Sequence, residues 1–221
     1  MFYIELHSQS LSEGSGKIIL TEVQMYTITI MRQFGSMGRP IAKELSGLLH
    51  IDFYDRDIVE KASGWMQMSV KEISSKEERS KYQYRYLRFP LGTDESYVQD
   101  AIFDTQKRVI LDVSEKSSCI IVGRCADFIL RNRANVLNFY IYAPPEVRLR
   151  NCIENLYMTE TVARRMLVDA DKARRAYHRR YAGYEPQDPA HKQFMIDSSV
   201  LGTEGTAQLI ADIVRLKFPE G

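Results

Sequence analysis

The hydrophobic positions of this chain form short apolar runs that alternate with longer amphipathic segments. Five runs have the length and apolar content of strands, at residues 26–30, 53–54, 119–122, 136–142 and 194–196. Four longer segments have the composition or apolar spacing of helices, at residues 39–49, 96–115, 159–181 and 206–218. The alternation predicts an α/β fold, a three-layer sandwich in which a parallel sheet carries helices on both faces.

Residues 1–24 stand apart from this alternation. They include Ser-Gln-Ser-Leu-Ser-Glu-Gly-Ser-Gly, which has the composition of a linker. We expect residues 1–24 to be an N-terminal extension, either a leader, an added segment or an appended hairpin. Residues 25–221 are expected to form a single domain.

Composition narrows the class of protein. The 221 residues are 44% hydrophobic and 27% charged with a net charge of +1, as in ordinary globular proteins, so global charge favours neither nucleic acid nor membrane as a partner. Neither a membrane-length apolar run nor a signal-peptide pattern is present. Three cysteines without C-x-x-C spacing and four scattered histidines predict free thiols in a cytoplasmic protein and no zinc site or other metal held by side chains.

A glycine-rich stretch, TITIMRQFGSMGRPI, occupies residues 27–41. A strand, a loop and a helix in this order form the framework of a phosphate-binding loop, in which backbone N–H groups and a helix N-terminus hold a polyphosphate. Against the motif G-x-x-x-x-G-K-[ST], Gln33 replaces the first glycine, Arg39 the lysine and Pro40 the Ser/Thr. The alternative is that the glycines only close a tight turn. The predicted nucleotide-binding residues are Gln33, Phe34, Gly35, Ser36, Met37, Gly38, Arg39, Pro40 and Ile41.

Polar residues follow several predicted strands. In a doubly wound sheet, ligands bind beyond the carboxyl ends of the strands, where Asp55, Arg124 and Asp197 stand. Acids and arginines around a phosphate loop suit an enzyme that positions two phosphorylated molecules. Each residue has a structural alternative: Asp55 could cap a helix, Arg124 could form a surface ion pair, and Asp197 could belong to a turn.

The segment at residues 159–181 is strongly basic. Three interpretations are open: a solvated helix face with ion pairs four residues apart, a surface for nucleic acid, or a mobile lid that brings arginines over a polyphosphate. The near-neutral net charge and the absence of an aromatic-plus-glycine RNA motif argue against the second. The basic residues concerned are Arg164, Arg165, Lys172, Arg174, Arg175, Arg179 and Arg180.

The run from residue 28 to residue 55 resembles the opening of the cytidylate kinase-like family, a divergent branch of the P-loop nucleoside-monophosphate kinases. That branch shows TISRQ-[YF]-GSGGR-x-IA followed by YD, and here Met31 and Met37 replace a serine and a glycine. The resemblance continues through VGRCAD at 122–127, YIYAP at 140–144 and IDSS at 196–199. The matching residues of the opening are Thr29, Ile30, Arg32, Gln33, Phe34, Gly35, Ser36, Gly38, Arg39, Ile41, Ala42, Tyr54 and Asp55.

The resemblance implies a P-loop NTPase-type fold and a role for several residues. The loop and Arg39 would hold the donor phosphates, and Asp55 would lie near the acceptor nucleoside. Arg124 would contact the acceptor phosphate, with Asp127 nearby because Cys125 replaces the family's usual acid. The resemblance also places an arginine after the fourth strand, Arg148, among the substrate-binding residues.

The same resemblance implies that Asp171 and Arg174 form a D-x-x-R motif in a lid at 156–189. Asp197 would lie near the acceptor sugar, and residues 63–97 would form a helical acceptor-binding insert. The expected activity is transfer of the ATP γ-phosphoryl group to a nucleoside monophosphate, CMP or dCMP, with Arg39, Arg124, Asp171 and Arg174 as the catalytic set. Mg²⁺ is expected through the nucleotide and water. The alternative is a weakly active nucleotide-binding or regulatory module, and the oligomeric state is left open.

Overall fold

The computed structural model describes residues 25–55, 58 and 94–219, and its centre is a five-stranded parallel sheet. The strand order is β2-β3-β1-β4-β5, with β1 in the middle between β3 and β4. Because all strands are parallel, their carboxyl ends lie at one edge. The strands are β1 (Thr27–Arg32), β2 (Asp52–Tyr54), β3 (Cys119–Val122), β4 (Val136–Tyr142) and β5 (Phe194–Asp197).

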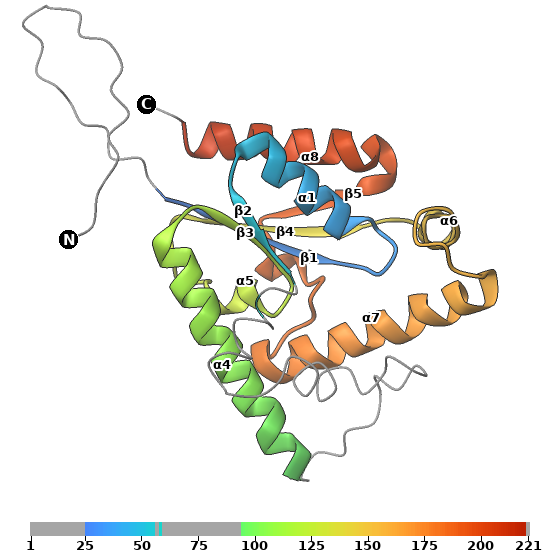
Figure 1. Cartoon of the computed structure of the whole chain (residues 1–221), viewed down its shortest axis with the longest axis horizontal. Helices are drawn as coiled ribbons and strands as arrows, with labels where there is room; N and C mark the ends of the chain where they lie inside the picture. The colour runs from blue at the N-terminus through green and yellow to red at the C-terminus, as the bar shows by residue number, and fades with distance from the viewer. Residues whose placement is uncertain (1–24, 56–57, 59–93, 220–221) are drawn as a thin grey trace, which may run out of the picture.

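Helices cover both faces of the sheet (Figure 1). In the described part of the chain, α1 and α8 lie on one face and α4, α5 and α7 on the other, while α6 lies near the end of β4. The helices are α1 (Gly38–Leu49), α4 (Asp94–Lys116), α5 (Ala126–Ile129), α6 (Pro145–Glu154), α7 (Glu160–Ala182) and α8 (Ser198–Lys217).

Two apolar clusters hold the layers together. One packs the inner faces of α1 and α8 on the sheet around Ile30 and Phe139. The other packs α4 and α5 on the opposite face around Ile110 and Ile121. Burying both sides of the central strands supplies the hydrophobic free energy that fixes the sheet order.

The predicted α/β three-layer architecture is confirmed, with small shifts of element ends. The largest difference concerns α8, which begins at Ser198 rather than at residue 206 and bends at Gly202, whose φ is 65°. Apolar spacing is weak before the bend, so the sequence pattern predicted a start that is too late. The helix begins where the Asp197 carboxylate accepts a hydrogen bond from the Ser199 N–H. The one-turn helix α5 was not predicted. Most of the predicted insert at 63–97 lies outside the described residues, as does the extension at 1–24.

The three cysteines are free and buried, as predicted. No helix in the described part of the chain is both long and apolar enough to cross a membrane.

Candidate functional site

The loop between β1 and α1 leaves the start of the helix open to a ligand. Met37 adopts a left-handed conformation with φ 59° immediately before α1, and its side chain makes no capping hydrogen bond. The first N–H groups of a helix have no acceptor within the helix, so those of Gly38 and Arg39 face the region beyond its end. Such a terminus carries a partial positive charge that favours an anion.

The loop is held from behind by hydrogen bonds to the neighbouring strand. The buried Ser36 hydroxyl donates to the carbonyl oxygens of Gln33 and Ile141, at 3.0 and 3.1 Å. Gln33 in turn accepts a bond from the N–H of Ala143 through its side-chain oxygen. On the other side, the Ser198 hydroxyl donates to the Ser36 carbonyl at 2.8 Å. These contacts fix the loop without using the helix terminus.

Gly35 allows α6 to approach the loop closely. Its φ is 76°, and a Cβ added there would lie 2.7 Å from the Arg148 carbonyl oxygen and 3.0 Å from Cys152 Sγ. The Asn151 side chain donates to the Gly35 carbonyl at 2.9 Å, and Arg148 Nη1 donates to the Phe34 carbonyl at 3.3 Å. Glycine is therefore required at position 35 for both conformation and space.

Helix α7 contacts the loop through the predicted D-x-x-R residues. The Phe34 N–H donates to Asp171 Oδ1 at 2.7 Å, and Arg148 pairs with Asp171 Oδ2 at 2.6 Å. Arg174 Nη1 donates to the Arg32 carbonyl at 3.2 Å, and its guanidinium lies 5.6 Å from the centre of the Phe34 ring. These contacts join the predicted lid directly to the predicted phosphate loop.

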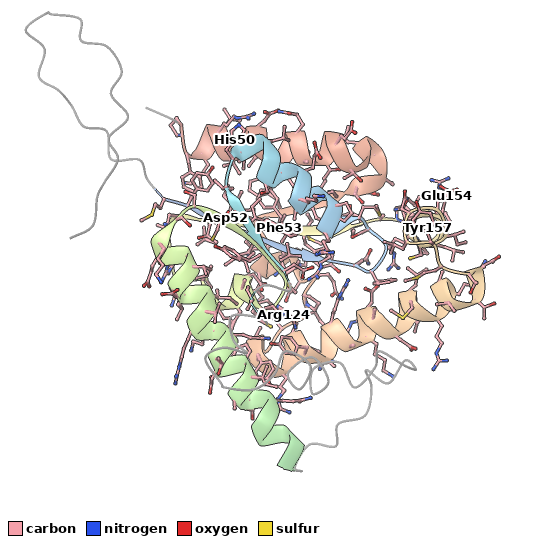
Figure 2. The ribbon with its side chains drawn as sticks, in the orientation of Figure 1. His50, Asp52, Phe53, Arg124, Glu154 and Tyr157 are labelled. Carbon is pink, nitrogen blue, oxygen red and sulfur yellow. The ribbon has the colours of Figure 1, made fainter. Side chains whose placement is uncertain are left out.

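Charged side chains from several elements meet at the carboxyl ends of β1 and β2. Asp55 Oδ2 pairs with Arg39 Nε at 2.8 Å and its Oδ1 with Arg32 Nη2 at 3.4 Å. Burial, together with the charges of Arg174, Arg124 and Arg39, lowers the pKa of Arg32 to about 9, although the charge of Asp55 opposes this. Arg124 follows β3 with φ 56° (Figure 2). Arginines thus outnumber carboxylates in this cluster, which suits a polyanion.

Asp127 lies in a different environment. Its buried carboxylate contacts the His178 ring at 3.1 Å, pairs with the buried Lys192 ammonium, and accepts from the Tyr184 hydroxyl. Burial raises its pKa, but the hydrogen bond from His178 and the charge of Lys192 outweigh this and lower the pKa to about 2. These contacts join Asp127 to α7 and to the segment before β5.

Asp197 also occupies a structural position, as the N-terminal cap of α8. Its Oδ1 accepts from both the N–H and the hydroxyl of Ser199, at 2.9 and 2.7 Å. Of the predicted site residues, the structure therefore brings together the loop, Arg39, Asp55, Arg148, Asp171 and Arg174. Asp127 and Asp197 instead hold elements in place.

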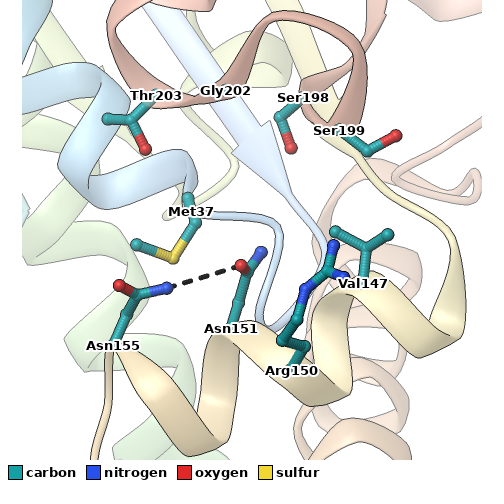
Figure 3. Close-up of a pocket in the computed structure, with 9 residues that line it drawn as sticks. All are labelled: Met37, Val147, Arg150, Asn151, Asn155, Ser198, Ser199, Gly202 and Thr203. Carbon is teal, nitrogen blue, oxygen red and sulfur yellow. Dashed lines mark hydrogen bonds between the residues drawn. The ribbon is translucent and has the colours of Figure 1, made fainter.

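A cavity lies on the other side of the loop, beside Met37 (Figure 3). Asn151 of α6 and Asn155 just after its end line it, with an amide hydrogen bond of 3.4 Å between them. Ser199 and Thr203 line it from the first turns of α8. Its amide and hydroxyl groups could bind the polar edge of a base or a sugar.

The described residues do not fit direct ligation of a metal ion at the loop. Pro40 has no hydroxyl, and the hydroxyl of Ser36 is used within the loop. Asp55 is paired with two arginines, and Asp127 is paired with Lys192. Among the described residues there is no cluster of three or more His, Cys, Asp or Glu side chains that could hold a metal.

The remaining arginines of α7 pair mostly with nearby acids. Arg164 pairs with Glu160 and Arg165 with Asp169, four residues apart, while Arg180 pairs with Asp100 of α4. This is the arrangement expected of a solvated helix face, as the first interpretation of the basic segment holds.

Two contributors to the site were not assigned a role from the sequence. Arg32 had a detectable signal, since it is a charged residue that ends an apolar strand directly before the glycine-rich loop. Asn151 had none, because its contact with Gly35 depends on how α6 packs on the loop.

Comparison with known proteins agrees with this geometry. The model of the cytidylate kinase-like family matches residues 27–200, most of the chain. The chain belongs to the cytidylate kinase-like family. No curated protein matches the sequence of this family member.

Solved structures share the fold of this cytidylate kinase-like chain. An uncharacterized protein from Eubacterium ventriosum is 24% identical with a TM-score of 0.63, over 86% of this chain and 98% of that one. Shikimate kinase from Acinetobacter baumannii, in complex with shikimate, is 13% identical with a TM-score of 0.51, over 90% and 97%. Shikimate kinase from Bacteroides thetaiotaomicron is 13% identical with a TM-score of 0.52, over 87% and 99%. At these identities the likeness establishes a P-loop kinase fold.

Proposed function

We propose that this protein transfers the γ-phosphoryl group of ATP to a nucleoside monophosphate, CMP or dCMP. The observation that carries the proposal is the excess of arginine around an open helix N-terminus. Arg32, Arg39 and Arg174 come from three different elements. Arg32 and Arg39 both pair with Asp55, while Arg174 pairs with Asp171 and donates to the Arg32 carbonyl. Neutralising the charge on a transferring phosphoryl group is the main task in this chemistry.

The donor and the acceptor would bind on opposite sides of this cluster. The donor's phosphates would accept bonds from the first N–H groups of α1, and its nucleoside would enter the cavity beside Met37. The acceptor phosphate would contact Arg124 beyond β3, with Asp55 near its nucleoside. Membership of the cytidylate kinase-like family supports a pyrimidine acceptor.

The chain's own residues would act by binding and orienting the two nucleotides. Arg148 and Asn151 hold the loop in shape, and Asp171 positions Arg148. Since the described residues offer no direct ligand for Mg²⁺, any such ion would enter with the nucleotide and its waters.

Thermal unfolding with ATP, GTP, CMP, dCMP and UMP, each with and without Mg²⁺, tests the proposal. A ligand present at about 100 times its dissociation constant adds roughly 2.7 kcal/mol to the free energy of unfolding. We expect shifts with ATP and with CMP or dCMP, and ADP formation when both are present. Failure of every monophosphate to shift unfolding or release ADP would refute the proposed activity.

A second candidate function is a nucleotide-binding module with little turnover. Two observations favour it. The Phe34 N–H already donates to the Asp171 carboxylate, so it is not available to a phosphate, and Pro40 lacks an N–H at the start of α1. Binding of ATP without ADP formation in the presence of each monophosphate would support this candidate.

A further inference from the structure

Arg32 occupies a space that two glycines leave for it. A Cβ added at Gly38 would lie 2.7 Å from Arg32 Cβ, and a Cβ added at Gly123 would lie 2.2 Å from Arg32 Nη1. The side chain therefore begins beside the start of α1 and extends to the end of β3. Larger residues at positions 38 and 123 would displace the guanidinium, so the backbone on both sides is shaped around it.

The charge around Arg32 is only partly balanced. Asp55 pairs with its Nη2, while Arg174 contacts its backbone carbonyl and Arg39 shares the same Asp55. Its side chain is 17% exposed, whereas that of Arg39 is 60% exposed. A partly buried guanidinium among other guanidinium groups gains more from an incoming anion than an exposed one, because solvent screens it less.

We propose that Arg32, rather than Arg39, is the principal side chain that binds the phosphoryl oxygens in transfer. It lies between Gly38, where the donor phosphates would bind, and Gly123, which precedes the arginine assigned to the acceptor phosphate. This inference deepens the proposed function and rests on it for the identity of the ligand. The predicted lysine-like role of Arg39 becomes secondary, since its Nε is held by Asp55 at the surface.

The contacts also explain the role of Asp55 in this arrangement. Its two carboxylate oxygens each hold a different arginine, one from the end of β1 and one from the first turn of α1. Asp55 thus keeps both guanidinium groups oriented before an anion arrives. A phosphoryl group would add hydrogen bonds to the remaining donors of the Arg32 fork.

The experiment is calorimetric titration with inorganic tripolyphosphate at about pH 7.5 and with a chelator present. The variants are Arg32→Gln, Arg32→Lys and Arg39→Gln, with Arg108→Gln on the exposed face of α4 as the matched control. Loss of a charged, bidentate contact predicts about 30-fold weaker binding for Arg32→Gln. Arg32→Lys keeps the charge but not the bidentate geometry, so binding should weaken roughly tenfold. Arg39→Gln should weaken binding less than about fivefold, as expected for an exposed charge, and Arg108→Gln should leave it unchanged.

The inference is overturned if Arg32→Gln binds tripolyphosphate within about threefold of the unmodified protein, if Arg39→Gln loses more, or if the unmodified protein does not bind it. Unfolding midpoints of all variants show whether a loss reflects misfolding, and Arg32→Lys preserves a charge if Arg32→Gln does not fold. ADP formation with CMP is measured separately. Its absence in the unmodified protein would refute the kinase proposal while the tripolyphosphate result still decides the role of Arg32.

Discussion

At the residue scale, we expect replacement of Arg124 to affect ligand use more than folding. It follows β3 in a left-handed conformation, and the resemblance assigns it to the acceptor phosphate. We expect Arg124→Ala to reduce kcat/KM for CMP at least about 30-fold, mainly through a higher KM, because a charged contact to phosphate is lost. The free energy of unfolding should change by less than about 1 kcal/mol, because alanine also carries a Cβ and meets the same positive φ, so the backbone strain is unchanged. Loss of stability in proportion to activity would contradict this assignment.

For single residues, the sequence indicated candidate site residues but not the side chains that they contact. It placed Arg148 and Asp171 among the candidate site residues but did not indicate that the two pair with each other and with Phe34. It also grouped Asp127 with the site because Asp127 follows Arg124 closely along the chain. The turn into α5 instead directs its carboxylate to His178 and Lys192, residues distant in sequence whose proximity no local pattern encodes.

Among the elements, α5 and α7 are joined by the buried Asp127 carboxylate. Asp127→Asn would leave the buried Lys192 ammonium without its counter-charge, and removing one partner of a buried ion pair costs about 3 kcal/mol. Urea unfolding at neutral pH measures this loss. Asp212→Asn, at an exposed pair with Arg215 on α8, is the control and should cost under about 0.5 kcal/mol.

The same carboxylate contributes an acid transition. Its pKa is lowered to about 2, so its stabilising contribution is present above the unfolded value near 4 and is lost as the pH falls toward 2. The difference in stability between the unmodified protein and Asp127→Asn should therefore shrink over this range. A difference independent of pH would contradict the ion-pair explanation.

The elements themselves were largely predictable because burial dictates their pattern. Strands such as β3 and β4 are covered on both faces, which requires continuous apolar runs. The start of α8 was not predictable in the same way, since its first turns depend on the Asp197 cap and a bend at Gly202 rather than on apolar spacing.

For the whole molecule, the net charge of +1 conceals a local concentration of arginine. We expect tripolyphosphate affinity to fall about tenfold between about 50 mM and 500 mM salt, because charges at the mouth of the site are screened. Calorimetry with cytidine, which carries no charge, provides the comparison and should show little change. Equal salt dependence for cytidine would indicate a general effect of salt on the protein.

The two attachments of α7 bear on how quickly a ligand could leave. Arg174 contacts the loop region, while four residues later His178 is buried against Asp127 and, beyond it, Tyr181 stacks on Phe103 of α4 at 3.9 Å. The carboxyl-terminal half of α7 is thus packed against α4 and α5, so movement of the whole helix away from the loop would break buried contacts. Opening by bending nearer the turn around Tyr157, whose φ is 54°, avoids that loss. The rate of product escape would then be set at that distant turn, and changes there would alter turnover without touching either nucleotide.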